Sequence, residues 1–154
     1  MNYIQPGEFY TLPIAIQKIF MDWKFDKWEI GNRLEDSSGE YVIVSYCDDY
    51  PPCGEVFGLF GVNETSCIKT RSVEKYKWVP YLTETDLRRF IESKTNYLVS
   101  PNYTSGGYII WLTHKDTQVL SYRERIITPY DDLLKTYWFV ACKIAKGELI
   151  NNVT

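Results

Sequence analysis

The chain has 154 residues and a net charge of −3 at pH 7; 45% of its residues are hydrophobic and 24% are charged. These values exclude a disordered, collagen-like or coiled-coil chain, and a chain of this length buries enough surface for a core without disulfides or metals. Aromatic residues make up 16% of the chain, whereas histidine occurs once. Because histidine carries protons in much of the chemistry near neutral pH, many catalytic mechanisms are disfavoured.

Charge and hydropathy also bear on where the protein acts. The acidic balance disfavours general nucleic-acid binding, which usually needs a basic excess. No apolar run approaches the ~18 residues of a membrane helix, and the first residues do not resemble an export signal. We therefore predict a cytoplasmic protein without membrane contact, in which the four cysteines are reduced thiols.

The first predicted elements are a helix and three strands. After a turn at residues 6–7, apolar residues at helical spacing predict an amphipathic helix over residues 12–26. β-branched and aromatic residues predict a central strand over residues 40–47. Residues 56–62 predict a short strand with a bulge or a close backbone contact, because glycines interrupt it, and residues 67–73 are weakly strand-like.

A second helix follows, and its start carries a capping signal. Thr83 stands at the N-cap and Asp86 at the matching position of a capping box, and the helix is expected to run to about Lys94. Residues 97–100 are predicted to be extended, and residues 101–107 to form turns.

The last part of the chain predicts a hairpin and a helix. Residues 108–112 form a continuous apolar run typical of a buried strand, and residues 118–125 alternate as a returning strand would. Thr128, followed by a proline, predicts the start of the last helix, and Gly147 its end. Five aromatic residues fall on apolar stripes and are expected in the core: Trp23, Phe90, Trp111, Tyr137 and Trp138.

These elements together favour the α+β class, because helices and strands do not alternate regularly. No repeat, linker or low-complexity segment divides the chain. We therefore predict one domain over residues 1–154, in which a mostly antiparallel sheet packs with three helices.

Residues that could support catalysis or bind a metal are few. Cys47, Cys53, Cys67 and His114 have the chemistry of zinc ligands but lack the closely spaced pairs that zinc sites use. A nucleophilic cysteine would need the same histidine, which stands at the end of a predicted strand, where a polar turn residue is expected. We therefore expect ordinary thiols and no catalytic residue, metal or cofactor, and leave open whether the four side chains converge. A redox-sensitive pair of Cys47 and Cys53 is the remaining alternative.

An acidic, aromatic segment is the first candidate for a binding surface. Protein interfaces typically place apolar anchors inside a charged rim, and this segment offers both. Contact with a basic protein partner would use five residues: Asp48, Asp49, Tyr50, Phe57 and Phe60. The alternative is a solvated loop without a partner.

A second candidate surface interleaves basic and aromatic residues, as proteins that bind single-stranded nucleic acids do. Its residues are Lys69, Arg71, Lys75, Lys77, Trp78, Arg123 and Arg125. The overall acidity of the chain argues against this use, and a solvated strand readily acquires lysines.

Residues 78–87 and 131–141 resemble segments of known proteins. A Trp and a Pro precede Thr83 at the start of one predicted helix, and the last helix carries a stripe that contains Ala, Val and Lys. In these features the chain resembles small uncharacterised proteins of phages and prophages, some of which belong to the phage α/β (ABA) sandwich domain family. The resemblance implies an origin and a fold type, and no activity or functional residue.

We therefore expect an intracellular protein that binds a protein partner and is not an enzyme. The resemblance points to an accessory or counter-defence protein of a phage or mobile element that acts on a host protein in the host cytoplasm. Two alternatives are an enzyme that works without histidine and a factor that binds single-stranded nucleic acid. Burial of the aromatic residues in the acidic segment would remove the first candidate surface.

Overall fold

The computed structural model describes residues 3–25, 27, 32–39, 41–46, 57–61, 68–69, 78–114 and 123–149. Contacts along the chain divide it into two compact units: unit 1 comprises Met1–Ile4 and Leu82–Thr154, and unit 2 comprises Gln5–Tyr81. A compact unit need not fold alone, so the single domain expected from the sequence stays a prediction.

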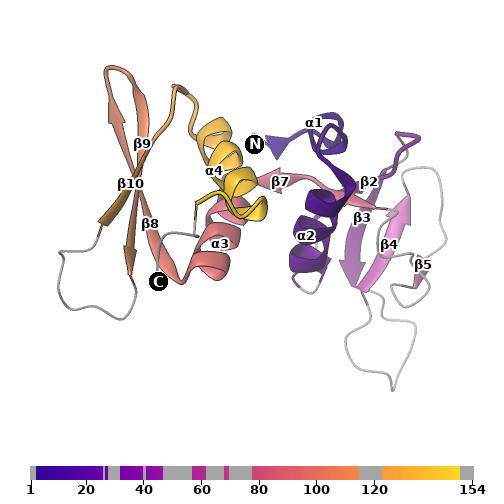
Figure 1. The fold of residues 1–154 in the computed structure, drawn as a ribbon. Coiled ribbons are helices and arrows are strands. Elements are labelled where there is room, and N and C mark those ends of the chain that lie inside the picture. Colours follow the sequence, from indigo (N-terminus) through magenta and orange to yellow (C-terminus); the bar gives the residue numbers. More distant parts are fainter. Residues whose placement is uncertain are drawn as a thin grey trace. The chain divides into compact units, whose positions relative to one another are not determined.

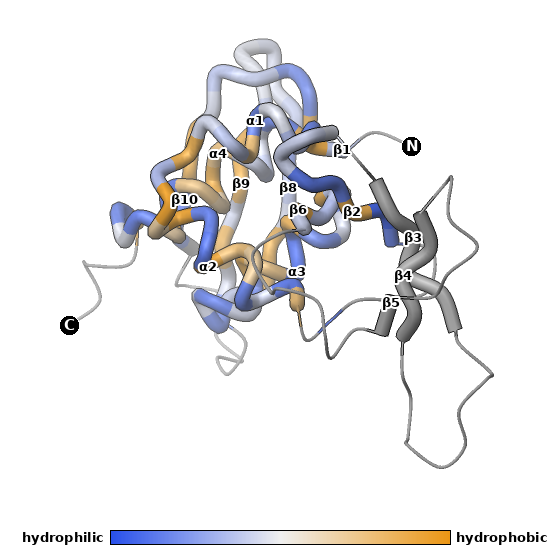
Figure 2. Tube along the Cα trace, turned by 90° about the vertical axis from the view of Figure 1, so that its right-hand side faces the viewer, coloured by the Kyte–Doolittle hydropathy of each residue, from blue (hydrophilic) through white to orange (hydrophobic). Residues whose placement is uncertain are grey.

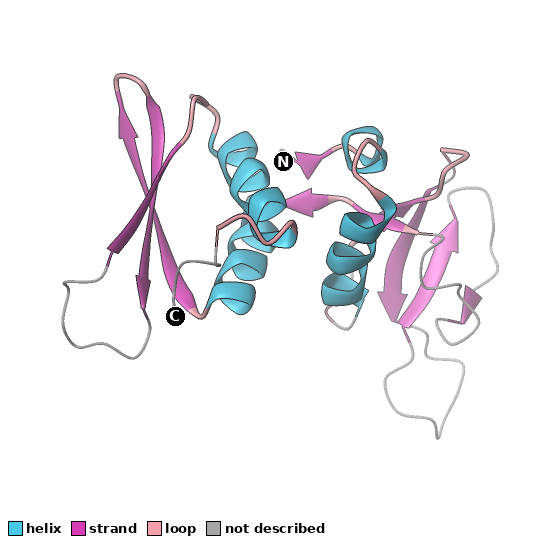
Figure 3. Ribbon diagram, viewed as in Figure 1, coloured by secondary structure: helices cyan, strands magenta, loops and turns pink. Residues whose placement is uncertain are grey.

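Unit 1 combines two long helices with a three-stranded antiparallel sheet (Figure 1). A short pair of strands opens it, with β1 (Tyr3–Ile4) antiparallel to β7 (Leu82–Thr83). The other elements of unit 1 follow in chain order: α3 (Glu84–Thr95), β8 (Tyr97–Thr104), β9 (Gly107–His114), β10 (Arg123–Ile127) and α4 (Leu133–Ala145). Helices α3 and α4 lie together on one side of the sheet (Figure 3).

Helix α3 begins where the sequence predicts. The Thr83 hydroxyl accepts a hydrogen bond from the N–H of Asp86 (3.2 Å), and the Asp86 carboxylate accepts one from the N–H of Thr83 (3.1 Å). This reciprocal capping box satisfies two N–H groups that the helix itself leaves unpaired. The helix ends at Thr95 and is capped by Asn96, whose φ of 60° is the left-handed conformation common after helices.

The sheet of unit 1 has the order β10-β9-β8, with every pair antiparallel. The predicted return strand does pair with β9, although the described part of it begins at Arg123. Strand β8 is longer than predicted, because residues 101–104 continue it instead of forming turns. A two-residue loop between Thr104 and Gly107 closes the hairpin of β8 and β9.

The approach to α4 corrects the predicted start of that helix. The N-cap is Asp132, whose carboxylate accepts a hydrogen bond from the N–H of Lys135 (2.8 Å). The Thr128 hydroxyl, which the sequence assigns to capping, donates to the carbonyl of Tyr108 (2.8 Å). Because residues 128–130 continue the pairing along β9, the helix cannot begin until this contact ends.

The core of unit 1 lies between the sheet and the two helices. Hydrophobic residues recur along α4 and β9, both drawn with orange segments in Figure 2. The hydrophobic side chains of unit 1 that are at most 1% exposed are Leu82, Leu87, Phe90, Ile91, Ile110, Leu112, Val140 and Ala141. Helix α4 ends at Ala145 and is capped by Lys146, and Gly147 follows at a φ of 74°, as predicted.

Unit 2 contains two helices and a five-stranded antiparallel sheet. The helices are α1 (Pro6–Tyr10) and α2 (Ile14–Phe25), and the ring of Phe9 meets that of Phe20 edge-on at 6.1 Å. The predicted turn at residues 6–7 is wrong, because Pro6 instead occupies the first position of α1, where its missing N–H costs little. Helix α2 confirms the predicted helix.

The sheet of unit 2 has the order β5-β4-β3-β2-β6. Its strands are β2 (Arg33–Glu35), β3 (Tyr41–Tyr46), β4 (Phe57–Gly61), β5 (Ile68–Lys69) and β6 (Val79–Pro80). The prediction of a central strand over residues 40–47 is confirmed by β3. The predicted bulge is absent from the described part of β4, whose five residues pair with β3 in unbroken register.

The α+β class is confirmed, with three helices longer than two turns and the short α1. The described strands form three small antiparallel sheets where the sequence suggested one. In the described ranges, no helix combines the length and the hydropathy that crossing a membrane would require.

Candidate functional site

The two faces of the sheet in unit 1 differ sharply in burial. Residues that stand opposite one another in a ladder share a face, so the register assigns each position to a side. On the side of the helices, Val99 pairs with Leu112, and Ile110 pairs with Ile126; all four are buried. We call the other side of the sheet the open face.

The open face carries apolar side chains that no helix of unit 1 covers (Figure 3). Ile127 is 61% exposed and Leu98 is 49% exposed. Trp111 stands between them, half-buried, in register with Ser100 on one side and Arg125 on the other. The face therefore has a central indole, two exposed aliphatic side chains and an exposed arginine. That combination of aromatic, aliphatic and arginine side chains is typical of binding surfaces.

The charge of this region is positive in an otherwise acidic protein. Arg123 and Arg125 are two of the five residues of β10, whereas the chain as a whole has a net charge of −3. Glu124 lies between them but pairs with Leu112, on the side of the helices. Arginine also stacks on aromatic planes and pairs with carboxylates in two-pronged geometry, so Arg125 suits an anionic group.

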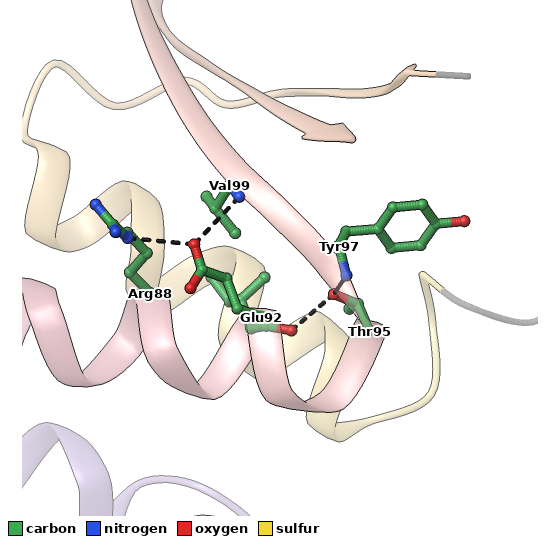
Figure 4. A network of polar contacts seen from close by, with 6 residues as sticks. Arg88, Glu92, Thr95, Tyr97 and Val99 are labelled. Atoms are coloured by element: carbon green, nitrogen blue, oxygen red, sulfur yellow. Dashed lines mark hydrogen bonds and ion pairs between the residues drawn. The ribbon is translucent and has the colours of Figure 1, made fainter. Parts of the chain in front are cut away.

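The outer edge of β8 is closed by side chains of unit 1 (Figure 4). The N–H of Val99 donates to the carboxylate of Glu92 (3.3 Å), which the guanidinium of Arg88 holds at 3.2 Å. The N–H of Tyr97 donates to the hydroxyl of Thr95 (3.1 Å). The next residue of β8 whose backbone turns towards this outer edge is Pro101, which has no N–H. Glu92 therefore does not simply face water, as its helical position suggests, but covers a sheet edge.

Sequence reasoning identifies only part of this surface. It names Arg123 and Arg125 as possible contacts for nucleic acid, and Arg125 is exposed on the open face. It assigns Trp111 to the core, whereas the indole is half-buried on that face. Leu98 and Ile127 carry no motif. The sequence of β10, Arg-Glu-Arg-Ile-Ile, has no regular alternation of polar and apolar residues that would show which face Ile127 lies on.

The other predicted contacts lie elsewhere. Lys69 is in β5 of unit 2, and Trp78 is only 4% exposed, which leaves little ring surface on which a base could stack. Phe57 and Phe60 lie on β4, in register with Tyr46 and Ile43. The remaining predicted contacts fall outside the described residues: Asp48, Asp49, Tyr50, Arg71, Lys75 and Lys77.

The aromatic residues expected in the core divide into two groups. Trp23, Phe90 and Tyr137 are buried, as predicted, with exposures of 7%, 0% and 3%. Trp111 and Trp138 are half-buried. The remaining aromatic surface in unit 1 includes Tyr103, which is 61% exposed and contacts the ring of Tyr108 edge-on at 5.0 Å.

His114 ends β9, where it meets the ring of Tyr97 edge-on at 5.4 Å. Cys47, Cys53 and Cys67 fall outside the described residues, so their predicted behaviour stays a prediction. In the part of the chain that is described, no three His, Cys, Asp or Glu side chains form a group that could hold a metal ion.

Cys142 of α4 is a free thiol whose pKa is raised to about 12, because burial disfavours the charged thiolate more than nearby Lys146 favours it. Only about one molecule in 10⁴ carries this thiolate at pH 8, and the thiolate is the reactive form. We expect iodoacetamide at pH 8 to alkylate Cys142 of the native protein at least about 100-fold more slowly than that of the denatured chain. Peptide mass spectrometry over a time course measures both rates, and equal rates would contradict the burial of the thiol.

A polar cluster in unit 2 is structural. The guanidinium of Arg33 lies 4.7 Å from the ring centre of Tyr81, whose hydroxyl donates to the carboxylate of Glu35. The hydroxyl of Tyr10 donates to the carbonyl of Glu35 (3.5 Å), and its pKa is raised by burial and by Asp36 and Glu35. These contacts attach α1 to β2 and pair β2 with the residue after β6.

Comparison with known proteins adds no relative: no family model, no curated protein and no solved structure matches the chain.

Proposed function

We propose that the protein is a binding module whose open face in unit 1 contacts an acidic region of a protein partner. The observation that carries the proposal is the exposure of Leu98 and Ile127 beside the exposed Arg125 on one face of a sheet. Apolar side chains supply the binding energy in such an interface, and the charges set the partner and the rate of association.

The partner's acidity follows from the charges of β10. An arginine next to an apolar surface gains more from a carboxylate than an isolated surface charge does, because the bound surface excludes water. The partner differs from that expected for the acidic segment of residues 48–60, which was predicted to bind a basic protein. A role as an accessory or counter-defence protein of a phage or mobile element remains part of the proposal and rests on the sequence resemblance.

A nucleic acid is the competing ligand, because Trp111 beside Arg125 could also stack on a base. The composition of unit 1 disfavours it: nine Lys and Arg residues are nearly balanced by eight Asp and Glu. Binding to single strands depends mainly on phosphate neutralisation, which needs a larger basic excess. A protein partner therefore fits the surface better.

The test compares the tagged protein with two variants that make the same change of charge. Arg125→Glu lies on the open face, whereas Lys135→Glu lies near the start of α4. We expect nuclease-treated lysate of the native host to yield a partner that binds the purified wild type and Lys135→Glu equally, and Arg125→Glu at least about tenfold more weakly. A partner that binds all three equally, or one lost on nuclease treatment, would contradict the proposal.

A further inference from the structure

The two edges of the sheet in unit 1 differ in how their backbone groups are used. In an antiparallel ladder, alternate residues turn their N–H and C=O groups towards the paired strand, and the residues between them turn theirs away. On the β8 edge the outward N–H groups of Tyr97 and Val99 donate to side chains, and Pro101 has no N–H (Figure 4). From Tyr97 to Pro101, that edge therefore has no outward N–H group left for another strand.

At the β10 edge, in contrast, the outward backbone N–H groups have no described hydrogen-bond acceptor. The N–H of Thr128 donates to the carbonyl of Tyr108 on β9 (3.1 Å), so the even-numbered residues of this segment face β9. Arg123, Arg125 and Ile127 therefore turn their backbone N–H and C=O groups outward. Among the described strands, β9 is the one that pairs with β10, and no described group accepts a hydrogen bond from these three N–H groups.

We propose that β10 receives an extended acidic segment of the partner as a fourth strand of this sheet. This inference rests on the proposed function and specifies how the partner binds. Addition of a strand to an open edge supplies main-chain hydrogen bonds, and the side chains of alternate positions supply the specificity. Every second residue of the added strand then lies on the open face, opposite or diagonal to Arg125 and Ile127.

The arginines of β10 favour an acidic segment as the added strand. Carboxylates on the open-face positions of the added strand would stand 4.5–5.5 Å, Cβ to Cβ, from the arginine positions, a typical spacing for cross-strand pairs of opposite charge. Aliphatic residues at the positions between them would lie on the side of the buried Ile126. An acidic segment with alternating aliphatic residues therefore satisfies both faces.

A second copy of the chain fits this edge less well. The antiparallel pairing of two β10 strands that uses all five residues places Arg125 directly opposite Arg125 of the other copy. Like charges directly opposite one another are destabilising. Self-association through this edge is thus disfavoured by the same residues that attract an acidic segment.

The probe is a short blocked peptide in which glutamate and valine alternate, added to the full-length protein and followed by NMR. We expect the amides of Arg125 and Ile127 to become protected from hydrogen exchange on binding, while those of β8 do not change. The same peptide N-methylated at every residue that faces β10 should bind at least about tenfold more weakly, because it cannot form the backbone hydrogen bonds. Arg125→Glu should weaken binding to a similar degree, and Lys135→Glu should not.

The outcomes separate this inference from the proposed function. Equal binding of the plain and N-methylated peptides, with loss in Arg125→Glu, overturns strand addition but leaves the open face as a binding surface. Binding that Arg125→Glu does not weaken overturns both. Preference for a single-stranded oligonucleotide over the peptide, or a concentration-dependent dimer in sedimentation, identifies a different occupant and also overturns the inference.

Discussion

Replacing Gly107 with alanine is expected to lower the free energy of unfolding by about 3 kcal/mol. Gly107 has a φ of 112°, which side chains rarely adopt, and a Cβ built there would lie 2.8 Å from the carbonyl oxygen of Tyr130 and 3.0 Å from that of Thr128. Both oxygens belong to backbone that is held against β9: the N–H of Tyr108 donates to Tyr130 and the N–H of Thr128 donates to Tyr108. The Tyr130 oxygen cannot move away without loss of its hydrogen bond, and movement of the Thr128 oxygen would disturb a residue whose N–H is bonded to Tyr108.

Two other glycines of unit 1 provide matched controls for this substitution. Gly106 has no atom within 4 Å of its Cβ position and no positive φ, so Gly106→Ala should change stability by less than about 0.5 kcal/mol. Gly147 has a φ of 74° with open space around it, so Gly147→Ala reports backbone strain alone, about 1 kcal/mol. Chemical denaturation followed by circular dichroism measures all three. If Gly107→Ala costs no more than Gly147→Ala, the close approach of residues 128–130 to β9 is wrong.

The same segment shows why some elements follow from the sequence and others do not. The start of α3 is predictable because Thr83 and Asp86, three residues apart, contain the whole capping box. The start of α4 is not, because the hydroxyl of Thr128 is engaged by Tyr108, twenty residues away. A local capping signal is reliable only where no distant acceptor competes for the same side chain.

Prediction of the candidate site requires knowledge of the strand pairing even more than prediction of the helix starts does. The apolar run of β9 predicts a strand correctly, but periodicity cannot tell a strand covered on both faces from one covered on a single face. Trp111 was therefore expected in the core, and the register shows it on the open face next to Arg125. Likewise, the cover of the β8 edge rests on Glu92 and Thr95, whose hydrogen bonds to the N–H groups of Val99 and Tyr97 correspond to no sequence motif.

Replacing Ile110 with alanine is expected to lower the free energy of unfolding by about 3 kcal/mol, whereas the same change at Ile127 should cost less than about 0.5 kcal/mol. The two residues have the same side chain in the same sheet but lie on opposite faces, with exposures of 0% and 61%. Truncation of Ile110 leaves a cavity between the sheet and the helices, while truncation of Ile127 removes only surface that water already reaches. Chemical denaturation of both variants measures the difference.

The two substitutions should affect binding of the acidic peptide in the reverse order, with the larger loss in Ile127→Ala. Ile127→Ala removes an exposed anchor of the open face and should weaken binding several-fold, because loss of an apolar anchor at the centre of an interface costs about 1 kcal/mol or more. Ile110→Ala, measured where the variant is fully folded, leaves that face intact and should bind as the wild type does. A large loss of stability in Ile127→Ala would mean that the side chain is buried in the folded protein, and the open face would then be unavailable to any partner.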